Sequence, residues 1–190
     1  MRKGGQVYEV IQSVANKTYS KCACAEAVSD IDALMTALQR LRYHCDVDAT
    51  LNWSLFDDVN YDADGGLPSR VRELVADAKN LVGGALSSSA ERQARLGVLV
   101  NTTMHTLAAV FMHCCRSVVT TTSSSGGGVA DQLVDAARSL RTTVAAASEL
   151  LDADRDETPG AVDSSKTALL ATAESLAKSL KLLVHEVKTV

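Results

Sequence analysis

The chain has 190 residues, of which 46% are hydrophobic, 4% are aromatic and 22% are charged, and its formal net charge is −4 at pH 7. This length suits one domain, which buries about 70% of the surface of its unfolded chain. The acidic balance excludes a general affinity for nucleic acid, because such binding depends on many contacts from Lys and Arg to phosphates.

The N-terminal quarter of the chain predicts two helices. The first ends near Lys17 or Tyr19 and has apolar side chains at helical spacing, namely Val7, Val10, Ile11 and Val14. The second helix covers residues 28–45. It is either continuous with the first or, as we favour, separated from it by a break.

No signal peptide and no transmembrane segment are expected. The N-terminus runs directly into a segment with Glu9 and Gln12, so it lacks the uninterrupted apolar core of a signal peptide. The longest apolar stretch, residues 107–112, is far shorter than the roughly 20 residues that cross a bilayer. The five cysteines form no recognisable disulfide framework, which favours reduced thiols and a cytoplasmic location.

Residues 46–67 predict a long acidic loop, because the helical pattern gives way to Asp, Asn, Tyr and Gly. Within this loop, residues 60–65 resemble the start of a calcium-binding loop, in which alternating oxygens converge on the ion. The twelfth position is Val71 instead of a bidentate Glu. We therefore interpret this stretch as a solvated acidic turn without a metal.

Four later segments share one spacing of apolar residues, alternately four and three positions apart, which places each set on one stripe of a helix. The stripes are Val71, Val75, Ala78, Val82 and Ala85; Leu96, Val100, Thr103, Leu107, Val110 and Cys114; Leu133, Ala137, Leu140, Val144, Ala147 and Leu151; and Leu169, Ala173, Leu176, Leu180, Leu183 and Val187. Such helices pack stripe to stripe. The sequence predicts a single all-α domain over residues 1–190, an antiparallel up-down bundle of five helices, or six if the N-terminal segment is separate.

The third helix begins at Pro68, where the missing N–H of proline has no cost, and runs to about Leu86. Gly83 and Gly84 either end it early or admit the close approach of another backbone. Ser88 and Glu91 then form a capping box for the fourth helix.

Two further connections are predicted toward the C-terminus. A Ser/Thr/Gly connector covers residues 120–128, because runs of these small residues favour flexible linkers. A loop over residues 152–163 contains Pro and Gly, and Asp163 or Ser164 can cap the last helix.

Residues with ligand-type atoms are scattered along the helices: Cys22, Cys24, His44, Cys45, His113, Cys114 and Cys115. Zinc sites need pairs spaced by two to four residues that converge on one point, whereas helix neighbours point about 100° apart. We interpret these residues as small core or boundary residues and expect no metal. A bundle that holds a metal or small molecule among His44, His113 and the cysteines is one alternative.

His105 lies in the middle of the fourth predicted helix and invites comparison with histidine phosphotransfer bundles. Those bundles place a Lys shortly after the His to steady the phosphoryl charge, and residues 106–110 contain none. No other residues can be argued to orient a base toward a nucleophile, so the sequence predicts that the protein is not an enzyme.

The last predicted helix carries a basic stripe at spacings of three, four and three: Lys178, Lys181, His185 and Lys188. Cations near a helix C-terminus complement the helix dipole, which explains the stripe without a function. The functional hypothesis is a groove between two helices, floored by Leu or Val and edged by Lys, that binds an acidic amphipathic helix of a partner. We predict these four residues as the partner-binding site.

Tyr8 is a candidate phosphotyrosine, because it precedes Glu9 and has the aliphatic Ile11 three positions on. The alternative is an amphipathic tyrosine at the edge of the first helix.

The helices resemble those of cytoskeletal and focal-adhesion bundles, namely talin-rod and vinculin-like modules, the focal-adhesion-targeting domain and the serine-rich bundle of Cas-family docking proteins. Residues 71–82, 129–140 and 169–180 carry this resemblance, which is one of helix style. The segment around Tyr8 is similar to the start of a focal-adhesion-targeting domain, although Val10 replaces the Asn of that family. The resemblance implies a cytoplasmic adaptor or scaffold at cell adhesions or the cytoskeleton, without cofactors. Its partners would be acidic leucine-rich motifs such as those of paxillin, or vinculin or actin.

A mechanosensitive bundle is the second alternative to an adaptor. Helices with many buried Thr and Ala gain less from packing than Leu-rich ones, so partial opening could expose an amphipathic segment such as residues 133–151.

Overall fold

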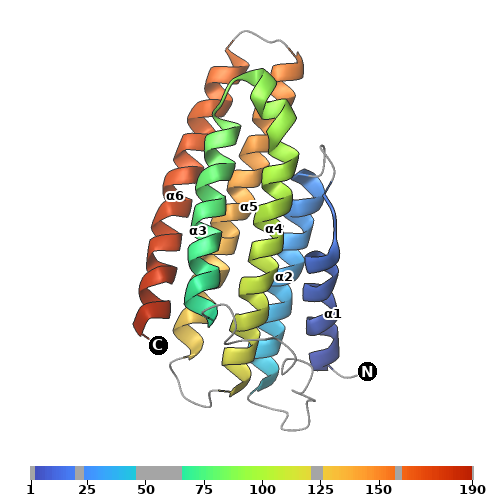
Figure 1. Cartoon of the computed structure of the whole chain (residues 1–190), viewed down its shortest axis with the longest axis vertical. Coiled ribbons are helices and arrows are strands. Elements are labelled where there is room, and N and C mark those ends of the chain that lie inside the picture. The colour runs from blue at the N-terminus through green and yellow to red at the C-terminus, as the bar shows by residue number, and fades with distance from the viewer. Residues whose placement is uncertain (1–2, 20–23, 46–65, 121–125, 157–159, 190) are drawn as a thin grey trace.

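The computed structural model describes residues 3–19, 24–45, 66–120, 126–156 and 160–189, which contain six α-helices and no strand (Figure 1). The helices are α1 (Lys3–Asn16), α2 (Cys24–Cys45), α3 (Gly66–Ala85), α4 (Ser89–Thr120), α5 (Gly126–Asp156) and α6 (Ala161–Thr189). The prediction of an all-α fold is confirmed. The N-terminal segment forms a helix of its own, with the favoured break between Asn16 and Cys24.

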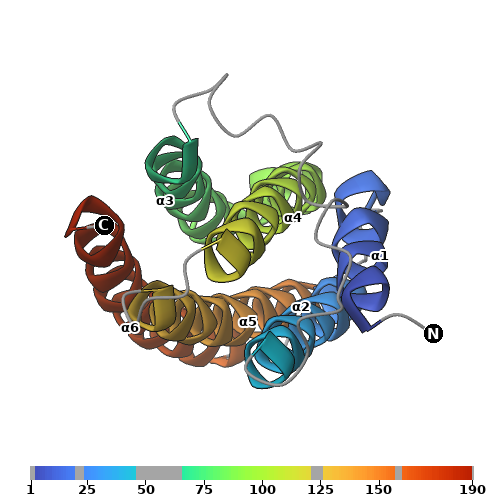
Figure 2. The same ribbon diagram turned by 90° about the horizontal axis from the view of Figure 1, so that it is seen from below.

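The helices pack in two layers, which are seen from the end of the bundle in Figure 2. One layer contains α6, α5 and α2, and the other contains α3, α4 and α1. The two central helices, α4 and α5, pack against each other and against helices of both layers. The peripheral helices α1, α3 and α6 therefore have the largest share of uncovered surface.

The predicted apolar stripes form the core of the bundle. Nearly all of their members are buried, from Val71 in α3 to Val187 in α6, and Phe111 and Ile11 add large, fully buried side chains. Three stripe residues are only half-buried: Val75, Val82 and Ala173. All three lie on the facing sides of α3 and α6.

Helices extend into the three stretches that the sequence predicted as connections. α3 begins at Gly66, inside the predicted loop of residues 46–67, and the positive φ of 68° at Gly66 suits a glycine at a helix entrance. The calcium-like stretch of residues 60–65 lies outside the described residues. The predicted connector of residues 120–128 is shorter, because α5 already begins at Gly126.

The predicted loop of residues 152–163 is also mostly helical, since α5 continues to Asp156 and α6 begins at Ala161. Tertiary contacts explain the longer α5: Ala153 is buried and Asp154 pairs with Arg92 of α4. These contacts are made with distant residues, so helix periodicity in the sequence could not reveal them.

The predicted cap of α4 is present in its Ser88 half. The hydroxyl of Ser88 accepts a hydrogen bond from the backbone N–H of Glu91 at 3.4 Å. The carbonyl of Ser88 accepts the first helical bond, from the N–H of Arg92, at 2.8 Å. Ser88 is therefore the N-cap residue of α4, as its position one residue before the helix requires.

Gly83 and Gly84 differ in their surroundings, although they are adjacent in α3. A Cβ atom at Gly84 would collide with the side chain of Leu99 in α4, whereas a Cβ atom at Gly83 would meet no atom within 4 Å. Gly84 thus permits a close approach of a side chain, and not of a backbone. Neither glycine ends the helix, which runs to Ala85.

This difference predicts opposite outcomes for two alanine substitutions. Gly83→Ala should raise the free energy of unfolding by about 0.5–1 kcal/mol, because alanine favours a helix over glycine. Gly84→Ala gains the same propensity but displaces Leu99, so its free energy of unfolding should be about 1–2 kcal/mol below that of Gly83→Ala. Urea unfolding followed by circular dichroism measures both. Equal stabilisation by the two substitutions would contradict the close packing at Gly84.

Candidate functional site

An open groove of about 620 Å³ lies between α3 and α6. Its lining is apolar except for one Lys on each helix and consists of Val75, Ala78, Lys79, Val82 and Gly83 of α3 with Ala173, Leu176, Ala177, Leu180, Lys181 and Val184 of α6. This volume is within the range of about 300–1,000 Å³ that is typical of ligand pockets in proteins. We call it the α3/α6 groove.

The groove exists because α3 and α6 pack mainly on other helices. α3 packs mostly against α4, and α6 packs mostly against α5, so the sides of α3 and α6 that face each other are left partly uncovered. Figure 2 shows α3 standing apart from α6, with α5 beside both. Gly83, Ala173 and Ala177 carry small side chains or none, which keeps the space between the two walls open.

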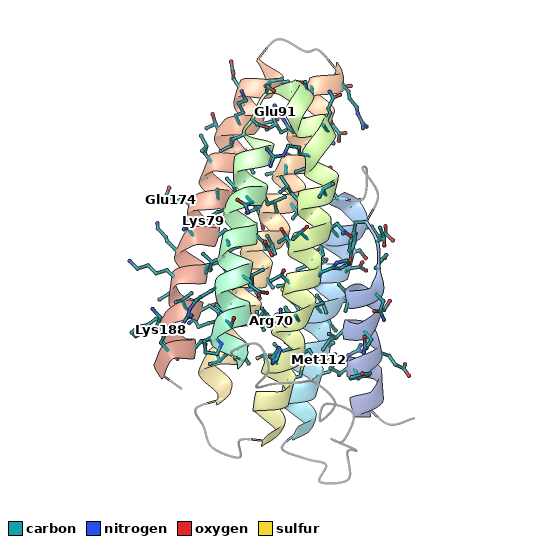
Figure 3. The ribbon with its side chains drawn as sticks, viewed as in Figure 1. Arg70, Lys79, Glu91, Met112, Glu174 and Lys188 are labelled. Atoms are coloured by element: carbon teal, nitrogen blue, oxygen red, sulfur yellow. The ribbon has the colours of Figure 1, made fainter. Side chains whose placement is uncertain are left out.

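Two exposed lysines, Lys79 on α3 and Lys181 on α6, stand on the opposite walls of the groove. Helical spacing places Arg72 two turns before Lys79 and Lys188 two turns after Lys181, on the same faces of their helices. Figure 3 shows Lys79 and Lys188 on the α3/α6 side of the bundle. The groove is therefore bordered by positive charge, although the chain as a whole is acidic.

The predicted basic stripe is only partly a groove feature. Lys181 lines the groove, whereas the Nζ of Lys178 pairs with the Oε1 of Glu174 at 3.3 Å, and both of these side chains are more than 70% exposed. His185 and Lys188 are exposed on α6 and are not among the described residues that line the groove. The structure thus brings one of the four predicted residues into the groove.

Lys79 is a groove residue that the sequence analysis did not select. It lies four residues after Val75 and three before Val82, beside the apolar stripe of α3. Its spacing was visible in the sequence, but periodicity does not say which stripe faces which helix. The pairing of α3 with α6 was the missing information.

Tyr8, the candidate phosphotyrosine, is half-buried in α1 and packs against the core. Its hydroxyl accepts a hydrogen bond from the Nε2 of Gln12 at 2.7 Å. These contacts agree with an amphipathic tyrosine at the edge of the first helix. Phosphorylation of Tyr8 stays a prediction.

The cysteines and histidines considered as ligands lie apart or in the core. Cys24, Cys114 and Cys115 are buried free thiols, and His113 is buried beside the last two. Among the described residues, no three side chains of His, Cys, Asp or Glu come together in a metal-binding arrangement. Cys22 and the side chains of His44 and Cys45 lie outside the described residues.

His105 is tied to the segment that follows α1, because its Nε2 lies 2.5 Å from the carbonyl oxygen of Lys17. Close by, the backbone N–H of Tyr19 donates to the Oδ1 of Asn101 at 3.0 Å. Both contacts hold the end of the α1 region on α4. The half-buried His105 thus has a structural partner in the fold.

A polar cluster that the sequence analysis missed surrounds Tyr19. The hydroxyl of Tyr19 donates to the Oδ2 of Asp30 at 2.6 Å, and the Nζ of Lys17 lies 3.0 Å from the same oxygen and 2.5 Å from the Oε1 of Glu26. Burial, followed by the bond to Asp30, raises the pKa of the Tyr19 phenol well above its ordinary value. Bonds to Glu26 and Asp30 raise the pKa of Lys17. We call this set the Tyr19 cluster.

The Tyr19 cluster predicts a loss of stability in alkali. The folded state holds Tyr19 neutral while the unfolded chain loses the proton near pH 10, so the contribution is complete below pH 10 and falls as the pH rises above it. Lys17 has the same sign, because its folded pKa is also raised above the model value of 10.5. Urea unfolding between pH 8 and pH 11.5 should show this loss. Tyr19→Phe should flatten the decline, and an unchanged slope would contradict it.

Arg92 and Asp154 form a buried ion pair at the end of the bundle where α4 begins and α5 ends. The Nε of Arg92 lies 3.1 Å from the Oδ2 of Asp154, and the two side chains are only 1% and 3% exposed. Arg92 also donates from Nη1 to the carbonyl of Ser87 at 3.1 Å. The Nε and Oδ2 atoms are close without hydrogen-bond alignment, so their attraction is mainly coulombic.

One described helical stretch, residues Ser89–Cys115 of α4, is long and apolar enough to cross a membrane by length and composition alone. Within its most apolar window, 61% of the residues are buried by other helices. A central helix of a packed bundle has these properties without a membrane.

The chain matches no protein-family model and no curated protein sequence. The resemblance to adhesion bundles therefore rests on the style of the helices alone.

Proposed function

We propose that this protein is a non-enzymatic adaptor or scaffold domain that binds a short acidic amphipathic helix of a partner in the α3/α6 groove. The observation that carries the proposal is an open apolar groove with a lysine on each wall, Lys79 and Lys181. In the helix-in-groove mode of recognition, an amphipathic helix lays its apolar face between two helices of its receptor.

The apolar lining supplies a reason for affinity. Val75 and Val82 on one wall and Ala173 on the other are half-buried, so a bound helix would remove their remaining apolar surface from water. Each Å² of apolar surface removed from water contributes about 25 cal/mol before the costs of association are subtracted.

The charges at the groove supply a reason for specificity. Lys79 and Lys181 attract acidic residues on either side of an apolar stripe, and the Arg72 and Lys188 positions extend that attraction along the walls. Complementary charge mainly raises the rate of association and suppresses partners of the wrong sign. A basic amphipathic helix would be repelled from both walls.

The proposed architecture is an antiparallel up-down bundle. Support comes from the short connections, since only residues 86–88 separate α3 from α4 and only residues 157–160 separate α5 from α6. Both pairs pack extensively, and short connections between packed helices favour antiparallel neighbours. The proposed setting is the cytoplasmic side of cell adhesions or the cytoskeleton, which rests on the resemblance of the helices to talin-like and vinculin-like bundles.

Isothermal titration of the whole chain with a synthetic peptide tests the proposal. The peptide is a 20-residue amphipathic helix with Leu at the stripe positions and Glu or Asp on both flanks, and its control has Lys at every acidic position. The expected result is saturable one-to-one binding of the acidic peptide only. Equal binding of both peptides, or binding of neither, would contradict the proposed function.

A further inference from the structure

The α3/α6 groove is hollow at one end. Gly83 on α3 and Ala173 and Ala177 on α6 line this end, which lies toward the end of the bundle where α3 ends and α6 begins (Figure 1). A Cβ atom placed on Gly83 would meet no atom within 4 Å. There is therefore room at Gly83 for a large side chain that comes from outside the chain.

The two lysines of the groove lie on one side of this hollow end. Lys79 precedes Gly83 by four residues, or about 6 Å along α3, and Lys181 follows Ala173 by eight residues, or about 12 Å along α6. Both steps lead away from the hollow end toward the opposite end of the groove, because α3 finishes and α6 starts at the same end of the bundle (Figure 1).

We propose that the groove selects a partner helix with an aromatic anchor, Trp or Phe, in the hollow end and with acidic residues on one side of that anchor. A bound helix has the same rise per residue as the walls, so acidic residues about four and seven or eight positions from the anchor would meet Lys79 and Lys181. This inference rests on the proposed function, and it names the partner of the same site.

An aromatic anchor is favoured because small residues leave the hollow end unfilled while apolar side chains surround it. Val82 and Leu176 border Gly83, Ala173 and Ala177 in the lining, so a ring would be enclosed by apolar atoms. Aromatic side chains bury about 150–250 Å² each, and residues that fill enclosed pockets at the centre of an interface dominate its binding energy. The lysines would then fix the register of the partner.

Peptide titrations against variants at Gly83 test the inference. Two acidic peptides are compared that differ only at the anchor, which is Trp in one and Leu in the other, and each is made in both chain directions. They are titrated into the unsubstituted chain, Gly83→Ala and Gly83→Leu, with binding followed by calorimetry. Leucine at position 83 fills the hollow end from α3 without a clash and favours the helix, so the variant should stay folded, which circular dichroism checks.

The unsubstituted chain should bind the Trp peptide about tenfold tighter than the Leu peptide, a difference typical of one anchor residue. Gly83→Leu should abolish this preference, with Gly83→Ala intermediate, while the dependence of binding on the acidic residues remains. Equal affinities for the two peptides, or a Trp preference that survives Gly83→Leu, would overturn the inference and leave the proposed function standing. Binding of neither peptide would overturn both.

Sedimentation equilibrium of the chain alone tests the other occupant of the groove, a second copy. A monomer is expected over the concentrations used for titration. A dimer that Gly83→Leu dissociates would assign the groove to self-association and overturn the inference.

Discussion

Arg92→Ala is expected to lower the free energy of unfolding by about 3–5 kcal/mol. The substitution leaves the carboxylate of Asp154 with a side-chain exposure of 3% and without its counter-charge. It also removes the bond from Arg92 to the carbonyl of Ser87, which joins the α3–α4 connection to the start of α4. Urea or guanidinium unfolding, monitored by circular dichroism, measures the change.

An exposed ion pair gives the matched control. Arg138 and Asp135 are three residues apart on α5, with Nη1 and Oδ1 3.3 Å apart, and their side chains are 62% and 54% exposed. Arg138→Ala should change the free energy of unfolding by less than about 1 kcal/mol, because exposed pairs are screened by solvent.

A double substitution separates the burial of charge from the loss of packing. Arg92→Met with Asp154→Leu removes both charges and keeps apolar volume, so it should recover most of the stability that Arg92→Ala loses. If Arg92→Ala cost no more than Arg138→Ala, solvent would have to reach the pair and its burial would be contradicted.

Charge reversal at the α3/α6 groove is expected to weaken the binding of the acidic peptide strongly. Lys181→Glu should weaken it about tenfold, and the double variant Lys79→Glu with Lys181→Glu about a hundredfold, because like charges would then face the peptide from both walls. Both lysines are exposed, so circular dichroism and urea unfolding should show little change in fold or stability. Titration calorimetry at low and high salt gives the affinities.

Lys178→Glu is the control for this charge reversal. Lys178 lies on the same helix and carries the same charge as Lys181, but it pairs with Glu174 and is not among the described residues that line the groove. Its reversal should change the affinity less than about threefold, because exposed and distant charges are largely screened. An equal effect of Lys178→Glu and Lys181→Glu would show that overall charge, and not the groove, attracts the peptide.

The fold class followed from periodicity because each helix had to bury one stripe. The stripe from Leu133 to Leu151 is buried throughout α5, as the spacing of four and three predicts. Helix ends were harder to predict. α5 passes the predicted end at Leu151 because Asp154 has a partner, Arg92, that lies 62 residues away in the sequence.

The candidate site could be predicted only in kind. An apolar furrow edged by lysines was expected on the last helix, and Lys181 does line such a groove. Lys79 was not expected, because its role depends on which helix faces α6. The Tyr19 cluster was missed for a similar reason, since Asn101 and His105 reach the end of the α1 region from α4. Contacts between distant segments leave no local pattern in the sequence.

The central claim is that an acidic amphipathic helix binds between α3 and α6. Backbone amide NMR spectra of the whole chain, recorded with and without a saturating amount of the acidic peptide, test this claim most directly. The account predicts that the largest shifts fall on residues 75–83 of α3 and 173–184 of α6, with small shifts on α1 and α2. Saturable binding with the largest shifts on α1 or α2, and none on α3 and α6, would contradict it.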